Sequence, residues 1–185
     1  MIQGFRRAAF SNEAGVGSAS IAHAAVKTKY PASEGMVALL GPFIDTIIVC
    51  SMTALVLVIT GYDSNTALEG VEMTSAAFSS VFGFAAKVIL TLAVVLFAFS
   101  TMISWSYYGI QAWQYLFGYS KEAEIAYKII FCGFVIIGSA MSLEPVINFS
   151  DAMIFAMSIP NMIALVVLAP VVKKEVTTYL EKIKG

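Results

Sequence analysis

Four long apolar runs, separated by short polar stretches, dominate the pattern of this chain. They cover residues 35–61, 76–117, 126–143 and 150–173. A transmembrane helix needs about 17–25 predominantly apolar residues, so each run is long enough to cross a bilayer. The pattern therefore predicts a membrane-spanning helix in each of the four runs.

The segment 8–26 has a different pattern from the other four. Its apolar part, residues 18–26, consists largely of small residues. At about 1.5 Å per residue it covers less than half of a hydrocarbon layer about 30 Å thick. This segment is therefore either re-entrant or a broken helix. The polar residues that precede the apolar part are Ser11, Asn12, Glu13, Gly15 and Gly17.

Composition supports a membrane environment for the whole chain. Of its 185 residues, 59% are hydrophobic and 12% are charged, whereas soluble domains have about 45–50% apolar and about 25% charged residues. We therefore expect an all-α membrane protein with about five transmembrane helices, the first one broken. These helices are expected to form a single transmembrane domain over 1–185, with the lipid bilayer as its surroundings and no nucleic acid partner.

The charges between the runs predict the orientation of the chain, since short loops rich in lysine and arginine stay in the cytoplasm. The loop 62–75 is acidic and is expected outside, and Glu144 and Asp151 are expected in a second outer connection. Arg6 and Arg7 are exceptions, because this topology places them on the outer side. The basic residues expected on the cytoplasmic side, including those of the C-terminus, are Lys27, Lys29, Lys121, Lys128, Lys173, Lys174, Lys182 and Lys184.

The string SNEAGVGS, residues 11–18, is the first candidate for chemistry. Non-helical backbone at membrane depth is tolerated only where it faces protein or water. There its carbonyl groups can hold a sodium ion, and the N-terminus of the next half-helix can receive a carboxylate. Gly15 and Gly17 suit such close approach because they have no Cβ. The alternative is a polar, glycine-rich loop that enters an ordinary helix.

Further polar candidates lie inside the long runs. Asp45 is either a functional intramembrane carboxylate or a residue that packs helices by hydrogen bonding with Thr46. Ser100 and Thr101 offer hydroxyl ligands for a sodium ion, or they hydrogen-bond the preceding turn of their own helix. Thr101 and Trp105 share one helix face by their spacing of four.

Two other features have simpler interpretations, and enzyme motifs are absent. His23, the only histidine, is interpreted as a packed or interfacial residue, and Pro160 beside Asn161 as a kink in the last run. The sequence contains no GxSxG, GxxxxGK[ST] or HExxH motif, which are signatures of hydrolases, phosphate-binding proteins and zinc proteases. We therefore expect a protein that is not an enzyme.

Four segments resemble one transporter family. The strings GFRRAAFSNEAGVGSAS, FIDTIIVCSMTALVLVITG, FAFSTMISWSYYG and SIPNMIAL occur in this order, and together they resemble the alanine/glycine:cation symporter family. The resemblance covers nearly the whole chain. It implies sodium-coupled symport of a small neutral amino acid, alanine or glycine, across the plasma membrane, with Na⁺ as coupling ion and no organic cofactor.

The resemblance also implies roles for particular residues. Residues 11–17 would form an unwound segment that binds substrate, and Ser100 with Thr101 would bind sodium together with the Phe97 carbonyl. Thr101 and Trp105 would also face the amino acid, and the bulk of Trp105 would keep the substrate small.

Length is where this chain departs from the family. Such transporters are similar to LeuT-type proteins, which have a five-plus-five inverted repeat with broken first and sixth helices. This chain resembles the C-terminal half and would begin inside the sixth helix. We therefore expect a fragment or one part of a split transporter that needs the missing N-terminal half. The alternative is a non-transporting membrane subunit, or a remnant, that needs a partner chain.

Overall fold

The computed structural model describes residues 2–13, 15–64, 68 and 70–184, and among these residues it contains helices and turns but no strand. The expected all-α class is therefore confirmed. Two compact units can be distinguished, one formed by 1–43 with 108–185 and the other by 44–107. They are described separately below.

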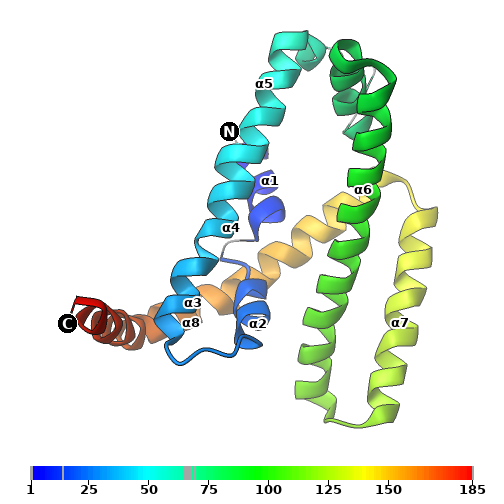
Figure 1. The fold of residues 1–185 in the computed structure, drawn as a ribbon. Coiled ribbons are helices and arrows are strands. Elements are labelled where there is room, and N and C mark those ends of the chain that lie inside the picture. Colours follow the sequence, from blue (N-terminus) through cyan, green and yellow to red (C-terminus); the bar gives the residue numbers. More distant parts are fainter. Residues whose placement is uncertain (1, 14, 65–67, 69, 185) are drawn as a thin grey trace. The chain divides into compact units, whose positions relative to one another are not determined.

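The first unit begins with a series of short helices. These are α1 (Ile2–Asn12), α2 (Ser18–Ala24), α3 (Pro31–Ala38) and α4 (Leu40–Pro42), shown in blue shades in Figure 1. Proline at the first position of α3 suits that helix, because its missing N–H has no partner in the first turn anyway. Contacts join α2 to α3, and α1 and α3 to the long C-terminal helix α8.

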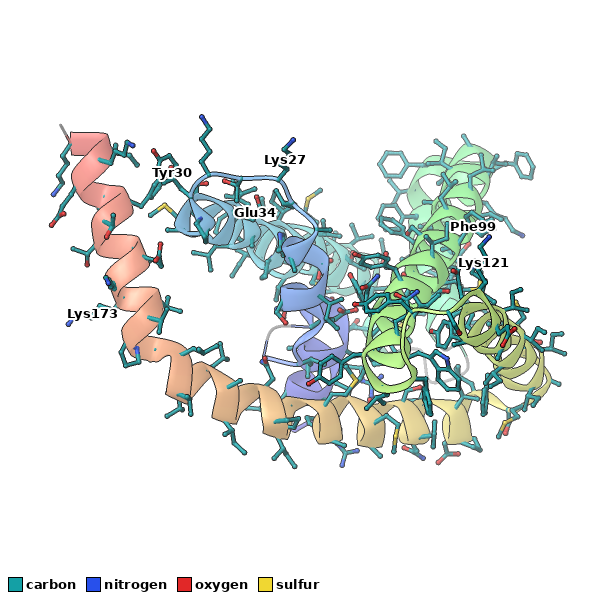
Figure 2. All side chains as sticks on the ribbon, turned by 90° about the horizontal axis from the view of Figure 1, so that it is seen from below. Lys27, Tyr30, Glu34, Phe99, Lys121 and Lys173 are labelled. Carbon is teal, nitrogen blue, oxygen red and sulfur yellow. The ribbon has the colours of Figure 1, made fainter. Side chains whose placement is uncertain are left out.

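Two longer helices complete the first unit, α7 (Lys121–Ala140) and α8 (Leu143–Lys184). The Ser120 side chain caps α7 by accepting a hydrogen bond from the Ala123 N–H at 3.1 Å. α8 continues through Pro160 and Pro170. Figure 2 shows that α8 changes direction before the labelled Lys173. The helix is therefore not broken at Pro160, and a kink at that residue remains a prediction.

An aromatic cluster joins α7 to the end of α6 (Val71–Phe117) in this unit. The Trp113 ring lies 4.3 Å from the Phe117 ring and 5.9 Å from the Tyr127 ring, measured between centroids. Gly109 makes this packing possible, because a Cβ there would lie 2.1 Å from the Tyr127 hydroxyl oxygen. A larger residue at Gly109 would have to displace the tyrosine.

The second unit contains most of the π-helix η1 (Phe43–Cys50), then α5 (Ser51–Thr60), the short η2 (Tyr62–Ser64) and most of α6. α6 is interrupted at Gly83, whose φ of 66° and ψ of −150° are not helical. Glycine reaches this region without steric penalty. α6 is therefore two helical segments joined by a kink.

Four helical stretches of the described residues are long and apolar enough to cross a membrane, namely 31–60, 71–117, 121–140 and 143–184. Few hydrophobic side chains among the described residues are buried, namely Val16, Ala77, Ala86 and Ile154. Large exposed apolar surface is unfavourable in water by about 25 cal/mol per Å². Lipid removes that penalty, so the arrangement fits a membrane protein.

The structure corrects one expectation about the connections. Glu144 and Asp151, expected in an outer loop, lie inside α8. Pro145 does not prevent this, because a proline is tolerated in the first helical turn. The helices also extend beyond the expected runs, since α7 begins at Lys121 and α8 continues to Lys184. Polar residues can continue a helix after its apolar, membrane-crossing part has ended.

Candidate functional site

The described backbone between α1 and α2 is not helical, and two glycines and one glutamate there have a positive φ. Glu13 has a φ of 54°, Gly15 of 82° and Gly17 of 105°. A left-handed conformation costs an L-residue about 1–2 kcal/mol, so the two glycines supply it cheaply and Glu13 does not. The Val16 N–H donates to the Glu13 carbonyl at 3.1 Å, which closes a turn. Among the described residues of the expected unwound segment 11–17, Glu13 and residues 15–17 are non-helical, whereas Ser11 and Asn12 are the last two residues of α1.

Side chains of this segment also contact one another across the break. The Ser18 hydroxyl is fully buried and donates to Oε2 of Glu13. Val16 is 3% exposed, so the centre of the break is packed against protein. Of the predicted substrate residues, Glu13 thus has a structural partner within the break, while Ser11 and Asn12 end α1.

Asn161 of α8 contacts the same break by a hydrogen bond and by close packing. Its Nδ2 donates to the Gly15 carbonyl oxygen at 2.9 Å, across 146 residues of sequence. A Cβ on Gly17 would lie 3.3 Å from the Asn161 Cβ. The break therefore packs directly against one side chain of α8, which the sequence had indicated only as the neighbour of Pro160.

An ion pair joins the same two parts of the chain. Arg7 of α1 donates from a guanidinium nitrogen to Oδ2 of Asp151 at 2.5 Å. The side chain of Asp151 is 11% exposed and that of Arg7 is 45% exposed. A buried carboxylate is stable only when it is paired, so Arg7, an exception to the predicted charge distribution, is explained by its partner.

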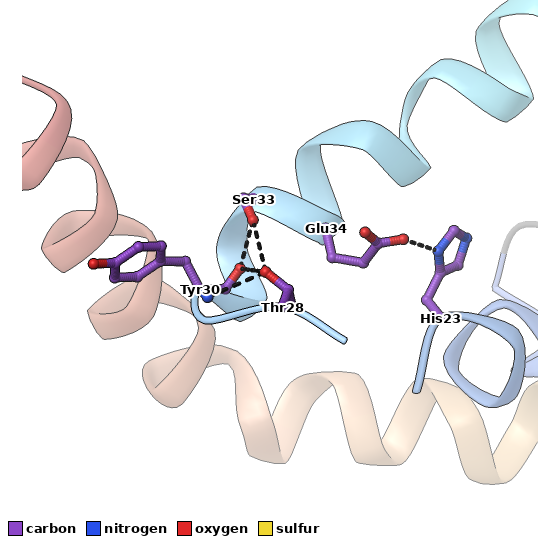
Figure 3. A network of polar contacts seen from close by, with 5 residues as sticks. All are labelled: His23, Thr28, Tyr30, Ser33 and Glu34. Atoms are coloured by element: carbon purple, nitrogen blue, oxygen red, sulfur yellow. Dashed lines mark hydrogen bonds and ion pairs between the residues drawn. The ribbon is translucent and has the colours of Figure 1, made fainter. Parts of the chain in front are cut away.

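Polar contacts connect α2 to α3 at the other end of the break. His23 Nδ1 and Glu34 Oε1 are 2.6 Å apart, and the Ser33 hydroxyl donates to the Tyr30 carbonyl at 2.7 Å, as shown in Figure 3. The Tyr30 ring also lies 5.7 Å from the Tyr179 ring of α8. His23 is thus a half-buried residue in polar contact with Glu34, which agrees with its interpretation as a packed one.

Asp45 lies in the π-helix η1 and is half-buried. Gly41 and Pro42 precede it, and a proline deprives a helix of one N–H donor. Short π-helical stretches occur frequently at functional sites. Asp45 therefore lies at an irregular point of the first long apolar run, and its role remains a prediction.

The predicted sodium ligands lie together on α6 in the second unit. The Ser100 hydroxyl donates to the Phe97 carbonyl oxygen at 2.9 Å, which is the bond to the preceding turn that is common for serine in membrane helices. Thr101 is exposed and Trp105 half-buried, and the helix is continuous from Phe97 to Trp105. Thr101 and Trp105 therefore share a face, as predicted from their spacing.

The structure places the candidates in two groups. Residues 11–17 belong to the first unit, whereas Asp45, Phe97, Ser100, Thr101 and Trp105 belong to the second. That these groups form one site remains a prediction. Sequence reasoning missed Asn161 and Asp151 as partners of the break and of α1. The available signals were a polar residue inside a charge-free run and an unexplained arginine.

Comparisons with known proteins agree with this picture. The model of the sodium:alanine symporter family matches residues 1–185. The sodium/alanine symporter AgcS of Methanococcus maripaludis is 41% identical over 181 residues, which are 96% of this chain and 39% of that protein. The probable sodium/glutamine symporter GlnT of Bacillus subtilis is 32% identical and is covered to 38% by the whole chain.

A third relative, the amino-acid carrier protein AlsT of Bacillus subtilis, is 32% identical over the whole chain and is covered to 39%. The chain thus spans about two fifths of the length of these curated relatives. No solved structure matches. The family is one of transporters and not of enzymes. With its four apolar helices and its match along the full chain, this multi-pass membrane protein belongs to the sodium:alanine symporter family.

Proposed function

We propose that this chain forms part of a sodium-coupled symporter that carries a small neutral amino acid, alanine or glycine, across the plasma membrane. The observation that carries the proposal is the non-helical break between α1 and α2, described at Glu13 and at residues 15–17, in a chain of this family. Discontinuous helices of this kind supply the substrate and ion sites of LeuT-type transporters. We propose that fold for the assembled protein.

The break supplies peptide groups for an amino acid. A helix end leaves up to four carbonyl or N–H groups without intrahelical partners. The carbonyl end of α1 and the N–H end of α2 both face the stretch between Asn12 and Ser18. A zwitterionic substrate requires acceptors for its ammonium group and donors for its carboxylate, and this stretch has both kinds. Ser11, Asn12, Glu13, Gly15 and Gly17 are the proposed substrate-binding residues.

The turn of α6 around Ser100 supplies oxygen atoms for sodium. Hard cations prefer carbonyl, hydroxyl and carboxylate oxygens. The Ser100 hydroxyl donates a hydrogen bond to the Phe97 carbonyl oxygen, so the lone pairs of the hydroxyl oxygen stay available for an ion. Phe97, Ser100 and Thr101 are the proposed sodium ligands, and Thr101 with Trp105 is proposed to face the substrate. Asp45 is a further candidate.

The remaining parts of the site and the orientation are also proposed. The chain spans about two fifths of its relatives, so we propose that an N-terminal half supplies the other ligands. The cluster of lysines near the end of α8 supports a cytoplasmic C-terminus, since such clusters stay on the cytoplasmic side. Sodium entering down its gradient would then carry the amino acid inward by alternating access.

The test is uptake by a paired complex. The chain would be co-expressed with the N-terminal region of the Methanococcus maripaludis relative and reconstituted into vesicles. Labelled alanine uptake would be measured with and without an inward sodium gradient. We expect sodium-dependent uptake, and we expect Thr101→Ala to raise the sodium concentration for half-maximal uptake about tenfold or more, because a polar contact to a charged group contributes about 1.5–3 kcal/mol.

Thr91→Ala is the matched control. Thr91 also lies exposed on α6, and its hydroxyl donates to the Lys87 carbonyl at 2.8 Å. It should leave the sodium dependence unchanged. A correctly inserted and paired complex without any uptake would instead favour the alternative, a non-transporting subunit or remnant.

A further inference from the structure

Asn161 is a polar residue in the middle of an apolar helix. It follows Pro160 in α8 and is half-buried. An amide side chain at membrane depth is unfavourable unless its hydrogen bonds are made within the protein. Neither the predicted substrate residues nor the predicted sodium ligands include it. Its contacts therefore need an explanation.

Both contacts of Asn161 lead to the break between α1 and α2. Its Nδ2 donates to the Gly15 carbonyl oxygen at 2.9 Å. The position of a Cβ on Gly17 would lie 3.3 Å from its Cβ and 3.4 Å from both Cγ and Oδ1. One side chain thus constrains two residues of the break that have a left-handed φ, by a hydrogen bond at Gly15 and by close packing at Gly17.

The Gly15 carbonyl oxygen requires a hydrogen-bond donor from another part of the chain. It lies outside both helices, so no regular helical bond orients it. Glycine has the greatest backbone freedom of all residues, and a break with two glycines would sample many conformations without an external constraint. A short amide on a continuous helix provides that constraint, because its donor is held within a narrow range of positions.

We propose that Asn161 is a positioning residue for the break, which holds the backbone of Gly15 to Gly17 in the conformation that binds the amino acid. This inference rests on the proposed function, and it assigns α8 a part in the substrate site. Asn161 acts through the peptide groups of the break. Its side chain therefore affects how well the substrate is bound.

Three substitutions of Asn161 and one control separate this role from general stability. Asn161→Ala removes the donor, and Asn161→Asp keeps the size but places a carboxylate against the Gly15 carbonyl. Asn161→Gln keeps the donor on a longer stem and should recover part of the function. The control is Ser158→Ala, in the preceding turn of α8, where the Ser158 hydroxyl donates to the Phe155 carbonyl oxygen of its own helix at 2.7 Å.

The first measurement is hydrogen–deuterium exchange of the 185-residue chain in lipid nanodiscs. A hydrogen bond contributes about 0.5–1.5 kcal/mol net, so we expect amides 15–18 to exchange about fivefold faster in Asn161→Ala and Asn161→Asp. Amides of α7 and the Ser158→Ala control should be unchanged. Unchanged exchange at 15–18, or an equal increase along the whole chain, would overturn the positioning role.

The second measurement is alanine uptake by the paired complex described above. We expect Asn161→Ala to raise the KM for alanine about fivefold with the maximal rate within about twofold, and Asn161→Gln to lie between it and the unsubstituted chain. Normal uptake with an unchanged KM in Asn161→Ala would overturn this inference alone. An unsubstituted complex without uptake would overturn the proposed function, and with it the substrate role of Asn161.

Discussion

Replacing Gly17 with alanine tests how tightly the break is packed against α8. Gly17 has a φ of 105°, and a Cβ there would lie 3.3 Å from the Asn161 Cβ. Gly15 provides the comparison, because its φ is 82° and a Cβ there would meet nothing within 4 Å. The two substitutions share the backbone strain and differ in the steric contact.

The expected magnitudes follow from these two terms. A left-handed conformation costs an L-residue about 1–2 kcal/mol, and this applies to both positions. Excess volume in a packed place costs about 1–3 kcal/mol, and this applies to Gly17 alone. We therefore expect Gly15→Ala to lower the free energy of unfolding by about 1–2 kcal/mol and Gly17→Ala by about 2–5 kcal/mol. Effects on the unfolded chain are the same for both and cancel in the comparison.

The assay is unfolding of the purified chain in mixed micelles with increasing dodecyl sulfate, followed by far-ultraviolet circular dichroism. Asn161→Ala is combined with each glycine substitution in a double-mutant cycle. Alanine at 161 removes the Cγ and Oδ1 atoms that would lie 3.4 Å from a Cβ on Gly17, but keeps the Cβ. Asn161→Ala should therefore reduce the loss of unfolding free energy caused by Gly17→Ala by about 1 kcal/mol. It should give no such steric relief to Gly15→Ala.

Equal penalties for Gly15→Ala and Gly17→Ala would refute the reasoning, because the contact with Asn161 would then have no energetic effect. Additive behaviour of Gly17→Ala with Asn161→Ala would lead to the same conclusion.

Two further predictions use the same unfolding measurement. Gly109→Ala should cost about 1–3 kcal/mol, since its Cβ would lie 2.1 Å from the Tyr127 hydroxyl oxygen; Gly133→Ala, with nothing within 4 Å, should be neutral or stabilising, and equal effects would contradict the close packing. Arg7→Ala should cost about 1–2 kcal/mol by leaving the buried Asp151 without its cation, a value reduced for the exposure of Arg7. Asp151→Asn added to Arg7→Ala should recover most of that loss, and no recovery would show that the charge is not its cause.

The membrane class and the main helices could be predicted from the sequence, because both depend on local pattern. The run 35–61 predicted a helix, and helical structure extends over 31–60. A long apolar run has few alternatives to a helix in lipid, where each backbone polar group must be paired within the segment. The exact helix ends were less predictable, since α8 continues through Asp151 and two prolines.

The candidate site was predictable only in part. Its polar segment could be identified because glycines and polar residues in an apolar context are unusual. The π-helix at Asp45 and the non-helical Gly83 inside α6 could not be predicted from the sequence. Both are small irregularities in segments whose apolar pattern predicts a continuous helix.

The sequence alone thus determines that this chain has membrane-spanning apolar runs, that a polar, glycine-rich segment lies at residues 11–17 and which family it resembles, because composition, hydrophobic runs and short motifs are properties of adjacent residues. Only the tertiary structure decides what holds the break. The bonds from Asn161 to Gly15 and from Arg7 to Asp151 join residues 146 and 144 positions apart. The packing of α1 and α8 brings these partners together. Because they are far apart in the sequence, no local pattern predicts that they are in contact.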